Sequence, residues 1–290
     1  MQKKLSSEDG YSISRKTMKG KIMPVTQVLE DSFVYSCTFE QQYSSNEQFL
    51  PHHVLAYQFS GETHIQHQDG KLTLKKDQTL LAQKNQLAKS IKIPATDKVY
   101  KSISVIITDA ALRQYARDNS NHENKNYTGK KNILLKPDAL LKSYFKSLLP
   151  YVEQSEKISK KLAAIKTNEA IELLLHLDSS LRSFLFDFSE PYKIDLKHFM
   201  LQNYHYNVPI EHFAKLTGRS LAAFKRDFGH TFQTSPRKWL QEKRLTEAYH
   251  LIKQKKRKPA DIYLEVGFEN ISHFYTSFKQ KFGVTPASIE

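Results

Sequence analysis

The chain has 290 residues, of which 39% are hydrophobic and 26% charged, and its formal net charge is +14. This length allows two domains, and the composition is typical of a globular protein rather than a disordered one. No apolar run is long enough to span a bilayer, and the polar N-terminus lacks an apolar signal segment, so we expect a cytoplasmic protein with no membrane partner.

The single cysteine excludes two kinds of site. Cys37 cannot form an internal disulfide or a multi-thiolate zinc site. It stands among apolar residues, and we expect its side chain to be a small buried group.

The basic charge is concentrated in the last third of the chain. Residues 191–290 hold 17 Lys and Arg against 9 Asp and Glu, which is +8 of the total +14. This favours a polyanionic partner for the C-terminal third. A well-solvated basic surface explains the charge alone equally well.

Residues 30–108 predict short strands. The segment HHVLAYQF at 52–59 mixes apolar and polar positions, and THIQHQ and KLTLKK flank the pair Asp69-Gly70. Asp-Gly supplies residues that tolerate a positive φ, so this pair predicts a hairpin. TLLAQ, LAKSIKI and VYKSISVIIT continue the pattern, which is typical of a sandwich or a small barrel.

Residues 109–188 predict helices. Thr108 or Asp109 can cap the first, and Pro137 precedes the second. The third carries an apolar face spaced by three and four residues: Leu173, Leu174, Leu177, Leu181, Phe184, Leu185 and Phe188. Two alternatives stay open for this face, which are packing on the chain's own barrel and a homodimer contact through the helices in 137–188. Ser189-Glu190-Pro191 then marks a domain boundary, because only helical patterns follow it.

The most informative feature is an internal repeat in the C-terminal third. SLAAFKRDFGHTFQTSP from Ser220 matches NISHFYTSFKQKFGVTP from Asn270 at an offset of 50 residues, without a gap. Each copy follows a short apolar segment that ends in glycine, at Gly218 and Gly267. A glycine that ends one helix and a capping residue that starts the next predict a helix-turn-helix in each copy.

The phenylalanines of each copy recur every four residues and predict a buried face. The opposite face carries short, polar or basic side chains that can approach a DNA groove. Between the copies, Ser235 and Pro236 start a long helix that sets the distance between them. The candidate DNA-binding residues are Arg219, Ser220, Ala222, Lys225, Arg226, Arg237, Lys238, Ser272, Tyr275, Thr276 and Lys279.

These motifs resemble the AraC/XylS family of bacterial regulators over roughly residues 195–289. The family pattern SPxxWLxxxRLxxA is found from Ser235 to Ala248, and GFxxxSxFxxxFKxxFGxTP from Gly267 to Pro286. The resemblance implies two helix-turn-helix units whose recognition helices lie in adjacent major-groove segments. Two departures are notable: Gln233 stands where the family has glycine, which leaves open whether the turn is altered, and Thr276 stands where the family often has arginine.

The N-terminal part resembles the cupin-like sensor domains of the same family, through HVLAYQFSGETHI and KLTLKKDQTLLAQKNQLAK. Metal-binding cupins use a His-x-His cluster. Here His52 and His53 are adjacent and His64 and His67 are three apart, so each pair points to opposite strand faces. We therefore expect no metal site. The sequence also lacks a P-loop, a G-x-S-x-G motif, a supported cysteine nucleophile and a zinc-hydrolase motif, so we expect no catalytic residue and no cofactor.

The sequence thus predicts an α+β protein in two parts. Residues 1–188 form a cupin-like regulatory or dimerisation domain that is helical from about residue 109, and residues 190–290 form an all-α domain of two helix-turn-helix units joined by a long helix. The predicted function is a sequence-specific transcription regulator. Its partners would be double-stranded promoter DNA, RNA polymerase, an unknown small-molecule or protein effector, and a second copy of the chain. The alternatives are a cupin-type metal-dependent enzyme fused to a basic helical domain, and a basic module that binds an acidic protein.

Overall fold

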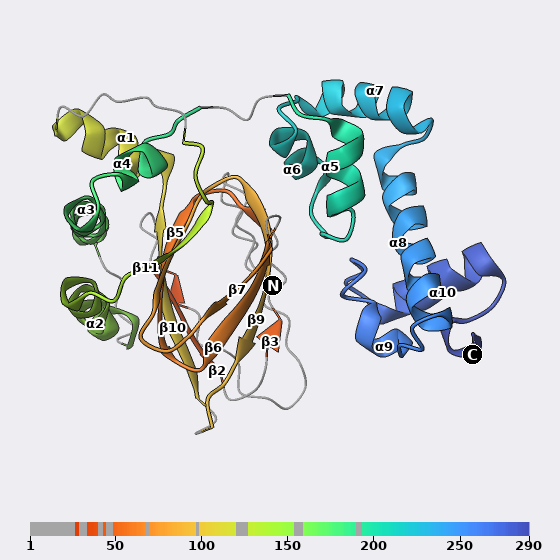
Figure 1. Cartoon of the computed structure of the whole chain (residues 1–290), viewed down its shortest axis with the longest axis horizontal. Helices are drawn as coiled ribbons and strands as arrows, with labels where there is room; N and C mark the ends of the chain where they lie inside the picture. Colours follow the sequence, from red (N-terminus) through yellow and green to blue (C-terminus); the bar gives the residue numbers. More distant parts are fainter. Residues whose placement is uncertain are drawn as a thin grey trace, which may run out of the picture.

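The computed structural model describes residues 27–28, 34–39, 43–44, 49–67, 70–96, 99–119, 127–153, 159–189 and 193–289. The strands come first in the chain and the helices follow. Figure 1 shows helices α1–α4 on one side of the strands and helices α5–α10 on the other. The C-terminal helices therefore stand apart from the N-terminal ones, with the strands between them.

Two antiparallel sheets make up the strand region. The first has the order β1-β2-β10-β5-β8-β11, and the second has the order β3-β9-β6-β7, with β4 also pairing with β9. Their bounds are β1 Gln27–Val28, β2 Val34–Phe39, β3 Tyr43–Ser44, β4 Phe49–Leu50, β5 His53–Ser60, β6 Glu62–His67, β7 Gly70–Leu74, β8 Thr79–Ala82, β9 Gln86–Ile93, β10 Tyr100–Ile107 and β11 Asn132–Leu135. Among the described residues, hydrogen bonding gives these two sheets rather than a closed barrel.

The predicted strands of residues 52–107 are confirmed, including the hairpin of β6 and β7. His67 pairs with Gly70, which is the first residue of β7 and has a φ of 141°. Asp69 lies outside the described residues, as does the side chain of Cys37 on β2.

The main core lies between the six-stranded sheet and the four helices α1 Asp109–Asp118, α2 Ala139–Glu153, α3 Lys160–Leu177 and α4 Leu181–Leu185. Thr108 caps α1 by accepting from the amide of Ala111. The apolar face predicted for this region packs against the chain's own sheet, with Leu174 and Phe184 fully buried. Of the two alternatives for that face, the structure therefore contains the first.

The C-terminal region contains helices and connecting turns, with no strand among its described residues 193–289. Its elements are α5 Leu196–Asn203, α6 Ile210–Leu216, α7 Leu221–Phe232, α8 Pro236–Lys253, α9 Pro259–Ile262, α10 Ile271–Phe282 and the 3-10 turn η1 Pro286–Ser288. Two cores hold it together, one around α5–α7 and one around α8–α10. Within the part of the chain that the structure describes, no helix is long and apolar enough to cross a membrane, and no group of three or more His, Cys, Asp or Glu is arranged to hold a metal ion.

Candidate nucleic-acid interface

Both copies of the repeat fold as helix-turn-helix units. The first pairs α6 with α7, and the second pairs α9 with α10. Gly218 and Gly267 have φ values of 64° and 99°, so both turns use the left-handed conformation that favours glycine. Ser220 caps α7 through the amide of Ala223, and Asn270 caps α10 through the amides of Ser272 and His273. The turns and caps predicted from the sequence are confirmed.

The repeated phenylalanines form the buried faces of the two units. Phe224 and Phe228 of α7 are fully buried in one cluster, and Phe274 and Phe278 of α10 are fully buried in another. Each of the two helices α7 and α10 therefore rests on a core of its own.

Helix α8 joins these cores. At its start, the ring of Trp239 lies 4.6 Å from that of Phe232. Toward its end, the ring of Tyr249 lies 4.8 Å from that of Phe282. The helix has 18 residues, which corresponds to a length of about 27 Å at a rise of about 1.5 Å per residue. One continuous helix therefore sets the separation of the two units.

The faces opposite the phenylalanines are open to solvent. On α7, Ala222, Lys225 and Arg226 are exposed, and the side chain of Arg226 is 67% accessible. On α10 and at the start of α8 the exposed candidates are Ser272, Thr276, Lys279, Arg237 and Lys238, together with the α7 cap Ser220. Tyr275 is half-buried, with its ring 5.9 Å from that of Phe274. These side chains are accessible to a ligand, and their contact with DNA stays a prediction.

Arg219 differs from the other candidates. Its side chain is only 8% accessible. The guanidinium donates to Oδ2 of Asp227 at 3.1 Å and to the carbonyls of Ile194 and Thr217 at 3.0 and 2.7 Å. These acceptors hold Nε and Nη1 of the guanidinium inside the domain, so Arg219 has a structural role, and its contact with DNA stays a prediction.

Gln233 does not alter the turn that follows α7. Its φ and ψ of 54° and 29° are left-handed, as is the φ of 76° at Gly283 in the second unit. The amide of Gln233 donates to the carbonyl of Gly229, and that of Gly283 donates to Lys279 in the same way. The first unit therefore keeps the geometry of the family turn with a residue that adopts it less readily.

Arg244 has a structural role in this domain that the sequence did not predict, although the residue lies in the motif SPxxWLxxxRLxxA. Its guanidinium donates to the carbonyls of Tyr204, Tyr206 and Gly267 at 2.8, 2.7 and 3.0 Å. Burial lowers the pKa of Arg244 to about 10. A Cβ at Gly267 would lie 2.8 Å from Nε of Arg244, so glycine is also required here for close approach. The arginine in the motif RL could have signalled this role, since a buried guanidinium needs several acceptors.

The strand region is attached to both C-terminal cores. Nζ of Lys89 on β9 donates to the carbonyls of His205 and Glu265 at 2.9 and 3.0 Å. The ring of Phe49 stacks on His212 of α6, with centroids 4.1 Å apart, and Leu87 is buried in the cluster of α5–α7. The two parts of the chain thus share a built interface rather than only a covalent connection.

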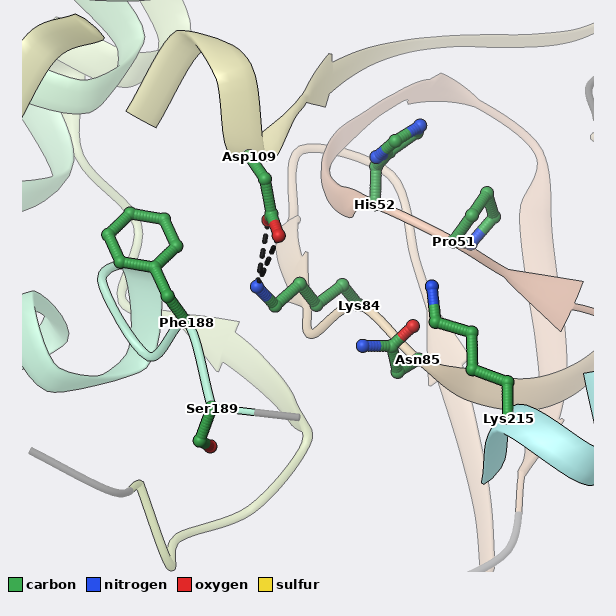
Figure 2. Close-up of a pocket in the computed structure, with 8 residues that line it drawn as sticks. All are labelled: Pro51, His52, Lys84, Asn85, Asp109, Phe188, Ser189 and Lys215. Carbon is green, nitrogen blue, oxygen red and sulfur yellow. Dashed lines mark hydrogen bonds and ion pairs between the residues drawn. The ribbon is translucent and has the colours of Figure 1, made fainter. Parts of the chain in front are cut away.

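A cavity of about 220 Å³ lies beside this interface (Figure 2). Its lining combines β-region residues, the start of α1, Phe188 and Ser189 at the end of the N-terminal part, and Lys215 of α6. Lys84 is buried there, with its Nζ 2.8 Å from both carboxylate oxygens of Asp109. Figure 2 shows Lys215 on the opposite side of Asn85 from that ion pair. The cavity therefore contacts both parts of the chain and the segment that joins them.

Two family models match the chain: a helix-turn-helix domain over residues 213–289 and the ExsA N-terminal regulatory domain over residues 53–186. The virulence regulon transcriptional activator VirF of Yersinia enterocolitica is 37% identical over 92 residues, which cover 32% of this chain and 34% of VirF. The HTH-type transcriptional regulator ExsA of Pseudomonas aeruginosa is 31% identical over 128 residues, which cover 43% of this chain and 46% of ExsA. The chain thus spans between a third and a half of the length of these curated relatives. Among solved structures, ToxT of Vibrio cholerae with a bound unsaturated fatty acid aligns with a TM-score of 0.41 and 14% identity, over 90% of this chain and 95% of ToxT.

Proposed function

Because this chain belongs to the AraC/XylS family, we propose that it is a sequence-specific transcription regulator that binds promoter DNA through two helix-turn-helix units. The observation that carries the proposal is the pair of units itself. Each has a recognition helix with a buried aromatic face and an exposed polar or basic face, and one helix joins the two cores. An ordinary helix pair with a solvated face would not explain two such units joined by one helix.

The two recognition helices would enter successive major-groove segments on one face of the duplex, about 10 bp apart. In the first unit Lys225 and Arg226 face the groove, and arginine can pair with both acceptors of a guanine edge. In the second unit, Ser272, Tyr275, Thr276 and Lys279 offer short hydrogen bonds, an apolar contact and one charge. The first unit would then supply the sharper base discrimination, while Lys279, Arg237, Lys238 and Ser220 contact the backbone.

The N-terminal part would regulate this binding. We propose that residues 1–188 form a cupin-like domain and residues 190–290 a separate DNA-binding domain. The cavity of Figure 2 supports an effector that touches both parts and the segment between them. A homodimer contact through the helices in 137–188 is a further part of the proposal, and Leu140 of α2 and Ile165 of α3, which are 50% and 52% exposed, are accessible to it.

The protein would act in the cytoplasm, where both promoter DNA and RNA polymerase are present. The named relatives are regulators, which supports a non-enzymatic role over the alternative of a cupin-type metal-dependent enzyme. Metal analysis of the purified protein tests that alternative directly, because a stoichiometric bound metal would favour it.

The proposal is tested by measuring affinity for a promoter fragment selected by the protein and for random DNA, at several salt concentrations. Specific binding should be about 10³-fold or more tighter than non-specific binding, and both should weaken as salt rises. Equal affinity for the two DNAs would contradict a sequence-specific regulator. Binding to acidic proteins with the same salt dependence would favour a basic interaction module instead.

A further inference from the structure

The two recognition helices are anchored differently at the same position of the repeat. Asp227 of α7 and Ser277 of α10 are 50 residues apart and correspond to each other. Oδ2 of Asp227 lies 3.1 Å from Nε of Arg219 and 3.2 Å from Nζ of Lys193. Oγ of Ser277 instead lies 3.2 Å from Nε2 of Gln241 on α8. One anchor is charged and the other is neutral.

The partners of the two anchors come from different parts of the chain. Lys193 and Ile194 precede α5, just beyond the proposed domain boundary, and Arg219 also donates to the carbonyl of Ile194. Asp227 therefore ties α7 to the connecting segment, Lys193 and Ile194, which precedes α5. Ser277 ties α10 to α8 within the C-terminal part, and its Oγ also lies 3.3 Å from Nε2 of His273 on α10 itself.

The charged anchor is strongly held. Hydrogen bonds from Arg219 and then Lys193 keep the pKa of Asp227 below its usual range, so its carboxylate is ionised at neutral pH. Arg219 is almost fully buried, and a buried guanidinium that loses its carboxylate must find another arrangement. A neutral residue at position 227 would thus disturb both Arg219 and the preceding segment.

The anchor also adjoins the proposed base-reading residue. The second carboxylate oxygen of Asp227, Oδ1, lies 3.5 Å from Nη2 of Arg226.

We propose that Asp227 is a positioning residue through which the connecting segment sets how sharply the first unit, but not the second, reads base pairs. The assignment rests on the proposed function, since it concerns the DNA that α7 would contact. It makes the first unit the one whose base reading depends on the residues that precede α5. The second unit keeps its base reading whatever the state of the connecting segment.

The test compares the full-length wild type with Asp227→Asn and with the matched variant Ser277→Ala, each on a library of sites altered in one half-site at a time. Asp227→Asn should reduce discrimination in the half-site of the first unit by about fivefold or more, the size of one weakened base contact, and leave the other half-site unchanged. Ser277→Ala should do the reverse. Lys193→Gln, which removes only the partner in the connecting segment, should show a smaller effect of the same kind as Asp227→Asn.

A merely structural role gives a different pattern. If Asp227→Asn only destabilised the fold, it would weaken binding to all sites alike, so an equal loss in both half-sites overturns the proposal. An unchanged first half-site also overturns it. Asp227→Glu keeps the carboxylate and should recover part of the lost discrimination. If the wild type shows no sequence preference, the proposed function is contradicted, and so is the role proposed for Asp227. A wild type with a sequence preference that Asp227→Asn leaves unchanged contradicts only the role of Asp227.

Discussion

Gln233 and Gly283 occupy the same position in the two turns. Exchanging the residue types tests how much free energy this left-handed turn costs a residue with a Cβ. Both residues have left-handed backbone angles, and the amide of each donates to the carbonyl of the residue four positions earlier. Left-handed backbone costs a residue with a Cβ roughly 1–2 kcal/mol, and glycine nearly nothing. Gln233→Gly removes that cost but also an exposed bond from Nε2 to the carbonyl of His230, worth about 0.5 kcal/mol or less.

Gln233→Gly should therefore stabilise the protein by about 0.5–1.5 kcal/mol. Gly283→Gln should destabilise it by about 1–2 kcal/mol, purely through backbone conformation, because a Cβ there meets no atom within 4 Å. In thermal unfolding of the full chain these changes correspond to shifts of a few degrees in opposite directions. Two shifts of the same sign, or no loss at Gly283→Gln, would refute the left-handed assignment of these turns.

Three further predictions concern the core, the interface and the boundary. Phe274→Ala should cost about 3–5 kcal/mol of stability, as for other buried phenylalanines, whereas Arg226→Ala should leave the melting temperature unchanged; equal destabilisation would mean the helix faces are wrongly assigned. Burial, and then the charge of Arg244 against the opposing effect of Glu265, lowers the pKa of Lys89 to about 8. Between about pH 8 and 10.5 the unfolded chain then holds more protons at this group, so stability should rise with pH in the wild type relative to Lys89→Met, and parallel pH profiles would contradict this. A fragment of residues 190–290 should fold and bind DNA more weakly than the full chain; an unfolded fragment beside an active full chain would argue against independent domains.

The sequence predicts the helix-turn-helix units well because their determinants are local. A glycine at the turn, a capping residue after it and phenylalanines every four residues all act within about 15 positions of each other. The left-handed angles of Gly218 and Gly267 and the burial of Phe224 and Phe274 are the direct outcome. The strands of residues 52–107 follow from alternation and turn residues in the same way.

The interface between the two parts was not predictable because its partners are distant in sequence. Lys89 donates to a carbonyl 116 positions away, and a lysine on a strand ordinarily points to solvent. The burial of Arg219 was not predictable for a related reason. An arginine next to a recognition helix in a basic segment suggests DNA, and its burial depends on Asp227 and Ile194, which no local pattern connects to it.

The central claim is that two recognition helices read DNA with divided roles, and one measurement tests it most directly. Affinities of the wild type, Arg226→Ala and Lys279→Ala are measured on a library of site variants at several salt concentrations. Arg226→Ala should relax specificity at one or two base pairs, at a cost of about 1–3 kcal/mol, and Lys279→Ala should weaken binding to all sequences and lower the salt slope by about one. If Arg226→Ala weakened every sequence alike, or Lys279→Ala changed the preferred sequence, the division of roles between the two units would be contradicted.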